Sequence, residues 1–221
     1  PGCFLRRYCH RYSDGQIDEY DLSATPNDFN VMTINMNRLI QDKRDLKDQV
    51  QKIHKYQIAY RSLMQEYKDA GMLPVYDSGF ITLDKQFLTI GINGLAEAAE
   101  YLGIDGRNND EYKHFAGEQL KIIFDENKVA KGEYGYMFNT EFVPAENLGV
   151  KNAKWDREDG YVVNRDCYNS YFYAVENEEV NAVDKFEMFV TLNIFWYFSI
   201  FGKSLKRLDS DLHMPILPAT T

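Results

Sequence analysis

The sequence predicts an α/β fold, and three observations lead to that class. Stretches rich in β-branched and apolar residues alternate with stretches of helical composition along the 221 residues, which is typical of a sheet covered by helices. One helical stretch is long and amphipathic. Two of the helical stretches end at a glycine, as helices often do. The length suits a single domain, and no internal repeat is visible.

The first regular element is expected at residues 30–36, after a loop-like region at residues 1–30. Residues 30–36 form a short run of β-branched and apolar residues, which is typical of a buried strand. Residues 42–70 form the long amphipathic stretch, which is followed by Gly71 and Pro74. Its apolar residues recur at helical spacings and are expected to face the core: Leu46, Val50, Ile53, Tyr60, Met64 and Tyr67.

The next elements follow the same alternation. Residues 75–89 are expected to be extended and to lead into a helix at 95–102. Because glycine permits a tight turn between a strand and a helix, we interpret the cluster of Gly91, Asn93 and Gly94 as structural. A further helix is expected at 110–130, and a strand at 138–143 is interrupted by Pro144. Four residues of the 110–130 helix are expected to face inward: Tyr112, Phe115, Leu120 and Ile123.

Residues 188–202 are the one marked shift in composition, because aromatic and β-branched residues are far denser there than elsewhere. The run is shorter than the roughly 20 residues that a membrane span needs, and Asn193 and Ser199 interrupt it. A membrane anchor is therefore disfavoured. The segment is expected to form a buried pair of strands or to be a stretch of non-native sequence.

Charge and cysteine content exclude some classes of partner. The net charge is −9 and no basic run exceeds two residues, which argues against nucleic-acid binding, since that needs clustered Lys and Arg. Cys3, Cys9 and Cys167 include no CxxC pair, and the four histidines share no ligand spacing, so neither a disulfide framework nor a metal site is predicted. A reducing, cytoplasmic compartment fits. The chain starts Pro-Gly-Cys without a leader, which predicts a segment of a longer protein.

Several stretches together resemble one protein family. They are GMLPVYD at 71–77, FLTIGINGLAEAA at 87–99, FNTEFVPAENL at 138–148, KWD at 154–156, DGYVV at 159–163 and DCYNSY at 166–171, together with TINM at 33–36 and Arg38. These stretches resemble the anaerobic (class III) ribonucleoside-triphosphate reductases, which are glycyl radical enzymes. The resemblance covers about residues 31–185, whereas 1–30 match only loosely and 186–221 diverge.

The resemblance implies a fold and a domain organisation. Residues 1–185 are expected to be part of a ten-stranded α/β barrel of the ribonucleotide reductase and glycyl radical enzyme type, with a finger-loop-like region at 1–30. In that family the finger loop carries a cysteine into the centre of the barrel. Residues 186–221 are then a divergent apolar tail, for which a shifted reading frame is one hypothesis.

The resemblance also implies an activity, which is the anaerobic reduction of ribonucleoside triphosphates to deoxyribonucleoside triphosphates for DNA replication by thiyl and glycyl radical chemistry. The family's radical glycine, zinc-binding cysteines and ATP-binding domain are not found in this sequence. A homodimer and an iron–sulfur activase that uses S-adenosylmethionine are the implied partners. The reductant is formate or a thioredoxin-like protein, and that choice stays open.

Two positions are expected to carry the radical chemistry. Cys3, in its Gly-Cys context, fits the finger-loop cysteine best, and Cys9 is its rival. The alternative for either thiol is a buried packing role. Asn35 of the TIN motif is expected to hold the ribose hydroxyls, because an amide donates and accepts without titrating. The alternative for Asn35 is that it caps a strand end or satisfies backbone groups.

Residues 140–147 resemble the family's segment at the mouth of the active site, where backbone N–H groups can face phosphates. This resemblance implies four substrate-binding residues: Thr140, Pro144, Ala145 and Asn147. Glu146 is expected either to carry a proton as the 2′-hydroxyl leaves as water or to stabilise a helix N-terminus.

Two other interpretations of the whole chain stay open. The first is a catalytically inactive, truncated piece of the barrel. The second, which is less favoured, is pyruvate formate-lyase-like acyl transfer on the same type of barrel. The adjacent pair of cysteines which that reaction uses is missing here.

Overall fold

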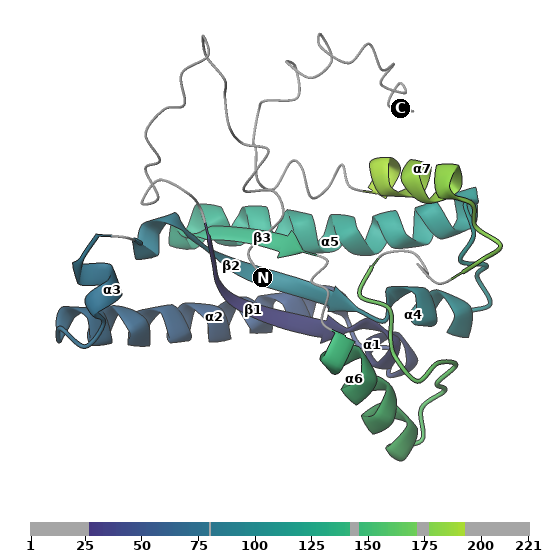
Figure 1. The fold of residues 1–221 in the computed structure, drawn as a ribbon, viewed down its shortest axis with the longest axis horizontal. Helices are drawn as coiled ribbons and strands as arrows, with labels where there is room; N and C mark the ends of the chain where they lie inside the picture. The colour runs from purple at the N-terminus through teal and green to yellow at the C-terminus, as the bar shows by residue number, and fades with distance from the viewer. Residues whose placement is uncertain (1–26, 80, 142–145, 172–176, 193–221) are drawn as a thin grey trace, which may run out of the picture.

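The computed structural model describes residues 27–79, 81–141, 146–171 and 177–192, and they form an α/β fold around a parallel sheet (Figure 1). The strands are β1 (Asn27–Asn35), β2 (Gln86–Asn93) and β3 (Met137–Glu141). They lie in the order β1-β2-β3, and both pairings are parallel. The predicted fold class is therefore confirmed, and so are the strands expected near residues 30–36 and 138–143.

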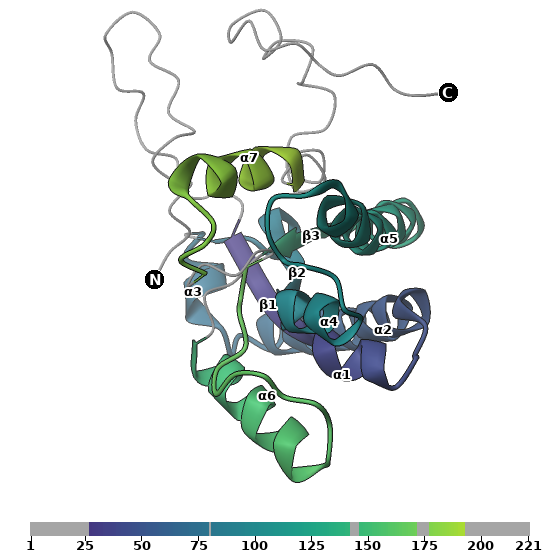
Figure 2. The ribbon, with the colours of Figure 1, turned by 90° about the vertical axis from the view of Figure 1, so that its right-hand side faces the viewer.

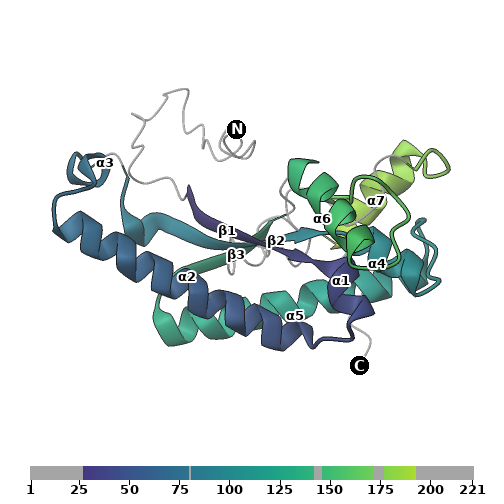
Figure 3. The ribbon, with the colours of Figure 1, turned by 90° about the horizontal axis from the view of Figure 1, so that it is seen from below.

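Two long helices make the crossovers between these strands. Helix α2 (Leu46–Asp69) connects β1 to β2, and α5 (Asp110–Tyr134) connects β2 to β3. Both helices lie on the same face of the sheet (Figure 3). The remaining helices are short: α1 (Met36–Gln41), α3 (Pro74–Asp77), a 3₁₀ turn at Leu83–Lys85, α4 (Leu95–Tyr101), α6 (Glu146–Glu158) and α7 (Ala182–Leu192).

Local signals explain where the long helices begin and end. The side chain of Asp45 accepts a hydrogen bond from the Asp48 N–H at the start of α2, and Asn109 accepts one from the Tyr112 N–H at the start of α5. Such caps satisfy backbone donors that lack partners inside the helix. Helix α5 ends at Gly135, whose φ of 72° is favourable only for glycine. The helices predicted at 42–70, 95–102 and 110–130 are thus confirmed.

The apolar core lies between the sheet and the layer formed by α2 and α5. It includes alternate residues of the strands together with inward residues of the helices, among them Ile34, Val50, Ile90, Ile92, Leu120 and Ile123. The four residues predicted to face inward from α5 are all buried. Among the described residues, no helix has both the length and the apolar run that a membrane crossing requires.

The predicted inward face of α2 is wrong in its second half. Tyr60 and Tyr67 are 41% and 40% exposed, whereas Gln57 and Arg61 are buried. These polar residues are buried because each has partners across the fold. Gln57 Nε2 donates to the carbonyl oxygen of Thr89 at 2.8 Å. Arg61 donates to the Leu83 carbonyl at 2.7 Å, and its guanidinium lies 4.3 Å from the ring centroid of Tyr136.

Two other expectations are corrected. Much of 75–89 is not extended, because Pro74 at the first helical position begins α3 and a 3₁₀ turn follows at Leu83–Lys85. Residues 188–192 belong to helix α7 rather than to a strand. The side chain of Asn181 accepts from the first N–H groups of α7, and Met188 and Leu192, one turn apart, are buried. Residues 193–202 lie outside the described residues.

Candidate functional site

The sheet has a polar second face. Ile34, Ile90, Ile92 and Phe138 point toward the helices, so the residues between and beyond them point the other way. The polar residues among these are Thr33 and Asn35 on β1, Thr89 and Asn93 on β2, and Asn139 and Glu141 on β3. Parallel sheets are usually apolar on both faces. A face that carries amides, hydroxyls and a carboxylate is therefore a candidate site for binding and chemistry.

The first two strands end in matching triplets. Thr33, Ile34 and Asn35 pair in register with Gly91, Ile92 and Asn93. The two asparagines therefore lie side by side at the carboxyl edge of the sheet, which is the edge where ligands bind in open α/β sheets. A Cβ on Gly91 would lie 2.5 Å from Thr33 Oγ1, so the glycine makes room for the threonine side chain.

Helix α6 lies across this edge, on the side of the sheet opposite to α2 and α5 (Figures 2 and 3). Two of its residues, one turn apart, contact the two asparagines. Asn152 Nδ2 donates to Asn93 Oδ1 at 2.8 Å. Asn35 Nδ2 donates to Asp156, with the two carboxylate oxygens at 3.1 and 2.9 Å. The inner face of α6 therefore matches the spacing of the two strand ends.

Asp156 is the centre of a polar network. Its carboxylate is fully buried and also accepts from Arg38 Nε at 2.7 Å and from the Tyr168 hydroxyl at 2.8 Å. Burial, and then the hydrogen bond to Asp156, raises the pKa of Tyr168 above its usual value, so this phenol stays a donor. Arg38 also forms an ion pair with Asp159 at 2.5 Å and lies over the ring of Tyr161.

The segment 165–170 closes the same edge from the side of β2. Asn93 Nδ2 lies 3.3 Å from the carbonyl oxygens of Tyr168 and Asn169, and the Gly94 N–H donates to the Asn169 carbonyl at 2.9 Å. The Asn169 N–H donates to Glu97 Oε1 at 3.0 Å. Burial raises the pKa of the Glu97 carboxyl, while the Asn169 N–H and Arg165 act in the opposite direction.

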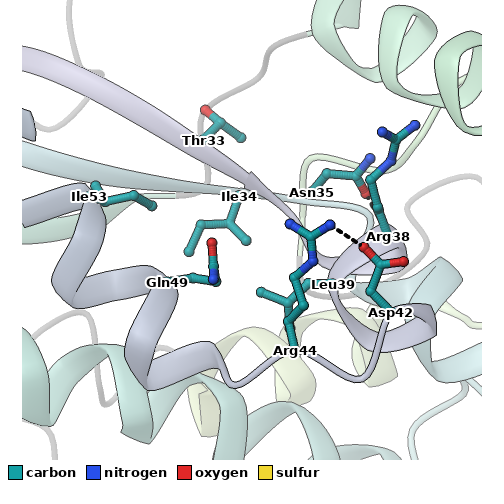
Figure 4. A pocket seen from close by; sticks show the side chains of 9 residues that line it. All are labelled: Thr33, Ile34, Asn35, Arg38, Leu39, Asp42, Arg44, Gln49 and Ile53. Carbon is teal, nitrogen blue, oxygen red and sulfur yellow. Dashed lines mark hydrogen bonds and ion pairs between the residues drawn. The ribbon is translucent and has the colours of Figure 1, made fainter.

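A cavity of about 230 Å³ opens at the outer edge of β1 (Figure 4). Its lining comes from β1, α1, α2 and the loop between the two helices, and consists of Thr33, Ile34, Asn35, Arg38, Leu39, Asp42, Arg44, Gln49 and Ile53. Arg44 and Asp42 of that loop form an ion pair at 2.7 Å. The volume is below the roughly 300 Å³ at which small-molecule pockets begin. By itself the cavity suits part of a ligand, and Thr33 and Asn35 connect it to the polar face.

Not all of the predicted site residues meet at this edge. Asn35 does, and its Oδ1 also caps α1 by accepting from the Arg38 N–H at 3.1 Å. Thr140 Oγ1 accepts from Asn127 of α5 at 2.9 Å, so its hydroxyl lies on the helix-covered face. Asn147 is exposed near the start of α6, whose first residue is Glu146. Cys3, Cys9, Pro144 and Ala145 lie outside the described residues.

Sequence reasoning missed four members of the site. The sequence interpretation places Asn93 in a structural turn and gives no role to Asn152, Asp156 or Tyr168. Two signals in the sequence point to the first three of these residues. One is the repeated Ile-Asn before each of two helices, and the other is the spacing of four between Asn152 and Asp156 on a helix. Neither signal shows by itself that Asp156 contacts the end of β1 and Asn152 the end of β2.

Within the described ranges, no group of three or more His, Cys, Asp or Glu residues is placed to hold a metal ion. His54 is buried and lies 2.8 Å from Asn127 Oδ1, on the helix side of the sheet. His114 is exposed and pairs with Glu118.

Comparison with known proteins gives a consistent result. Residues 3–193 match the family model described as anaerobic ribonucleoside-triphosphate reductase. The chain is similar to crystal structures of the anaerobic ribonucleotide reductase from Thermotoga maritima, one with citrate in the active site and one with dATP bound in the specificity site. Each has a TM-score of 0.72 and 28% identity over 77% of this chain. A third structure, in complex with dATP and CTP, gives the same values.

These matches cover 34% of the chain of the first structure and 31% of the other two. The present chain thus spans about a third of the length of the solved structures it matches. No protein with a curated description matches it.

Proposed function

The chain belongs to the anaerobic ribonucleoside-triphosphate reductase family of oxidoreductases, and from this premise we propose that it supplies a substrate-facing part of the catalytic barrel. Its fold corresponds to a part of the barrel of the anaerobic ribonucleotide reductase. The proposed reaction is the reduction of a ribonucleoside triphosphate to the deoxyribonucleoside triphosphate. The observation that carries the proposal is the polar second face of the sheet, with Asn35 at its carboxyl edge.

The hydrogen-bonding capacity of Asn35 supports its role at the ribose. A side-chain amide has two donor hydrogens and two acceptor lone pairs. The Arg38 N–H occupies one lone pair, and a single hydrogen shared between the two Asp156 oxygens accounts for that contact. One hydrogen and one lone pair are left for the ribose hydroxyls. Because the amide does not titrate, it holds the sugar unchanged while protons move around it.

The proposed chemistry begins with a thiyl at Cys3, with Cys9 as the rival position. The sulfur takes the hydrogen atom from C3′ of the ribose, so that an S–H bond forms and a carbon radical is left. The 2′-hydroxyl then leaves as water after receiving a proton, which Glu146 is proposed to carry. Two electrons and a proton then form the C2′–H bond, and they are supplied as formate is oxidised to carbon dioxide or as a thioredoxin-like dithiol becomes a disulfide. The S–H hydrogen finally returns to C3′ and restores the thiyl.

Other parts of the longer enzyme are required by this proposal. A glycyl radical outside this segment, installed by an iron–sulfur activase, supplies the oxidising equivalent for the thiyl. We propose that the longer enzyme is a homodimer. Residues Thr140, Pro144, Ala145 and Asn147 are proposed to flank the substrate phosphates at the mouth of the site, chiefly through backbone N–H groups.

A segment exchange tests the function. Residues 3–193 of this chain would replace the matching segment of the Thermotoga maritima reductase, and the chimera would be activated and supplied with CTP. We expect formation of dCTP, loss of turnover in a Cys3→Ser chimera, and retention of turnover in a Cys9→Ser chimera. Asn35→Ala should lower turnover without preventing formation of the glycyl radical signal in electron paramagnetic resonance.

The radical signal separates the outcomes. A folded chimera that carries the radical but makes no dCTP would contradict the proposed function and favour the inactive alternative. Turnover that survives both cysteine substitutions, made together, would exclude Cys3 and Cys9 as the position of the thiyl. Loss of turnover in Cys9→Ser alone would move the thiyl to Cys9.

A further inference from the structure

The buried carboxylate of Asp156 receives hydrogen bonds from three side chains that come from separate parts of the chain. They are Asn35 at the end of β1, Arg38 in α1, and Tyr168 after α6. Side-chain exposure of Asp156 is 0%. A buried carboxylate is costly unless donors surround it. These donors therefore allow the Asp156 carboxylate to be buried, and the carboxylate in turn holds the three donor side chains in place.

The carboxylate determines which way the Asn35 amide points. Asp156 offers only acceptors, so it selects the amide nitrogen of Asn35. The Arg38 N–H offers only a donor, so it selects the amide oxygen. Turning the amide over would place its oxygen against a carboxylate and its nitrogen against an N–H. Both hydrogen bonds would be lost, and two repulsive contacts would take their place.

The neighbouring pair shows the opposite arrangement. Asn93 is in register with Asn35. The residue of α6 that contacts Asn93 is the amide Asn152, whereas the one that contacts Asn35 is the carboxylate Asp156. Asn152 donates to Asn93 Oδ1 at 2.8 Å, so that the nitrogen of Asn93 turns away toward the carbonyl oxygens at 168 and 169. Two asparagines in matching positions thus point in opposite directions. The carbonyl oxygens at 168 and 169 offer only acceptors and select the Asn93 nitrogen, and the Asn152 amide, unlike a carboxylate, can donate to the Asn93 oxygen.

The two asparagines also differ in exposure, and Asn35 is the more exposed of the two. Asn93 is 1% exposed, and its polar atoms contact the segment 168–170 and α6. Asn35 is only partly buried and lines the cavity at the edge of β1. Asn35 is therefore the member of the pair that a ligand can reach, and its orientation is the one that matters for a ligand.

We propose that Asp156 is a positioning residue, which holds the Asn35 amide with its nitrogen toward α6 and its second hydrogen toward the polar face. The consequence for catalysis rests on the proposed function, in which Asn35 holds the ribose. Asp156 does not itself touch substrate in this proposal. It acts through the amide.

The first test is made on the full chain, labelled with ¹⁵N at asparagine, by following hydrogen exchange of the Asn35 side-chain amide. In Asp156→Asn we expect exchange to accelerate by about ten-fold or more, the usual consequence of losing a hydrogen bond to a charged group, and the amide resonance to shift. Asp159→Asn is the matched control. It removes the other carboxylate partner of Arg38, at 2.5 Å, and has no contact with Asn35 among the described hydrogen bonds.

Two results would overturn the proposal. One is an Asn35 exchange rate that does not change in Asp156→Asn, and the other is an equal acceleration in Asp159→Asn. If circular dichroism shows that Asp156→Asn does not fold, the proposal is tested by amide exchange in the unmodified chain. Its Asn35 amide hydrogens should exchange more slowly than those of exposed Asn147, and equal rates would refute the inference.

A second test separates this proposal from the proposed function. In the active chimera, Asp156→Asn should reduce kcat/KM for CTP by about 100-fold, the scale of loss for a misplaced group at a reacting centre, whereas Asp159→Asn should stay close to the unmodified chimera. A chimera that is inactive before any substitution contradicts the proposed function, while the exchange measurement still tests Asp156. An active chimera that is unaffected by Asp156→Asn contradicts the positioning role alone.

Discussion

Gly91 pairs with Thr33 on the polar face, and the threonine side chain leaves no room for a side chain at position 91. A Cβ on Gly91 would lie 2.5 Å from Thr33 Oγ1 and 3.2 Å from its Cβ. We therefore expect Gly91→Ala to lower the free energy of unfolding by about 1–3 kcal/mol, as overpacking usually does. Urea unfolding followed by circular dichroism measures it. Adding Thr33→Ala should recover part of the loss, because it removes the nearest atom.

The control for this substitution is Gly132→Ala in α5, where a Cβ would meet nothing within 4 Å. Gly132 lies in the last turn of α5, so that change should stabilise by less than the roughly 1 kcal/mol of a helix interior. A Gly91→Ala protein as stable as the unmodified one would mean that Thr33 moves aside without cost. Failure of Thr33→Ala to recover any stability would point to a different cause of the loss.

His54 predicts a specific dependence of stability on pH. Burial lowers the pKa of its imidazole, against the opposing effects of its hydrogen bond to Asn127 and the charge of Glu126. The unfolded chain, with a pKa of about 6.5, therefore takes up the proton first as the pH falls. The contribution of His54 is complete above about pH 6.5 and is lost as the pH falls from there toward the lower folded pKa.

This dependence is measured by urea unfolding at several values between about pH 7.5 and 5. His54→Gln should flatten the decline in stability over that range. Parallel pH profiles for the unmodified chain and His54→Gln would contradict the assignment.

At the scale of the elements, α2 offers a direct test of which face is buried. Val50 is fully buried, and Tyr67 is 40% exposed. Val50→Ala should cost about 2 kcal/mol of unfolding free energy as a core truncation, and Tyr67→Gln should change it by no more than about 0.5 kcal/mol. Chemical denaturation of both variants measures the two losses of unfolding free energy and shows which is larger. A larger loss of unfolding free energy for Tyr67→Gln would mean that Tyr67 faces the core, as the apolar spacing predicts.

The end of α2 and the start of α5 were predicted to within one residue, but the start of α2, the end of α5 and the inner face of α2 were not. The sequence prediction began α2 at residue 42 and ended α5 at residue 130, whereas the cap Asp45 and the glycine Gly135 place these boundaries about one turn later. The orientation of α2 depends instead on the sheet. The register of β1 against β2 shifts between Asp28 and Asn30, and Gln57 donates to the Thr89 carbonyl beside that irregularity. No local pattern reports such a contact.

The same distinction applies to the site. Asn35 was found because it belongs to a short motif, and its capping of α1 follows from adjacent residues. Its contact with Asp156 spans 121 positions of the sequence. That contact depends on strand register and on where α6 lies, neither of which the sequence specifies locally. The opposite orientations of Asn35 and Asn93 follow only after both are known.

At the scale of the molecule, the two faces of the sheet are held by different forces. The face toward α2 and α5 buries the main apolar cluster. The inner face of α6 consists of Gly149, Asn152, Ala153 and Asp156, so Ala153 is the only apolar side chain buried from that helix in the described structure. Apolar burial contributes about 25 cal/mol per Å², whereas a hydrogen bond contributes a net of about 1 kcal/mol, or about 1.5–3 kcal/mol where one partner is charged, as at Asp156.

Helix α6 should therefore open without unfolding of the rest. We expect native-state hydrogen exchange of the full chain to show α6 backbone amides exchanging at least about ten-fold faster than those of β2 and α5, with little dependence on low concentrations of denaturant. The amides of β2 should follow global unfolding. When α6 opens, Asn35 loses its contact with Asp156, and Asn93 loses its contact with Asn152 but keeps those with residues 168–170. If α6 and β2 instead exchanged at one common rate with one denaturant dependence, the polar contacts would hold α6 as firmly as the apolar core holds α5, and both faces would unfold as one unit.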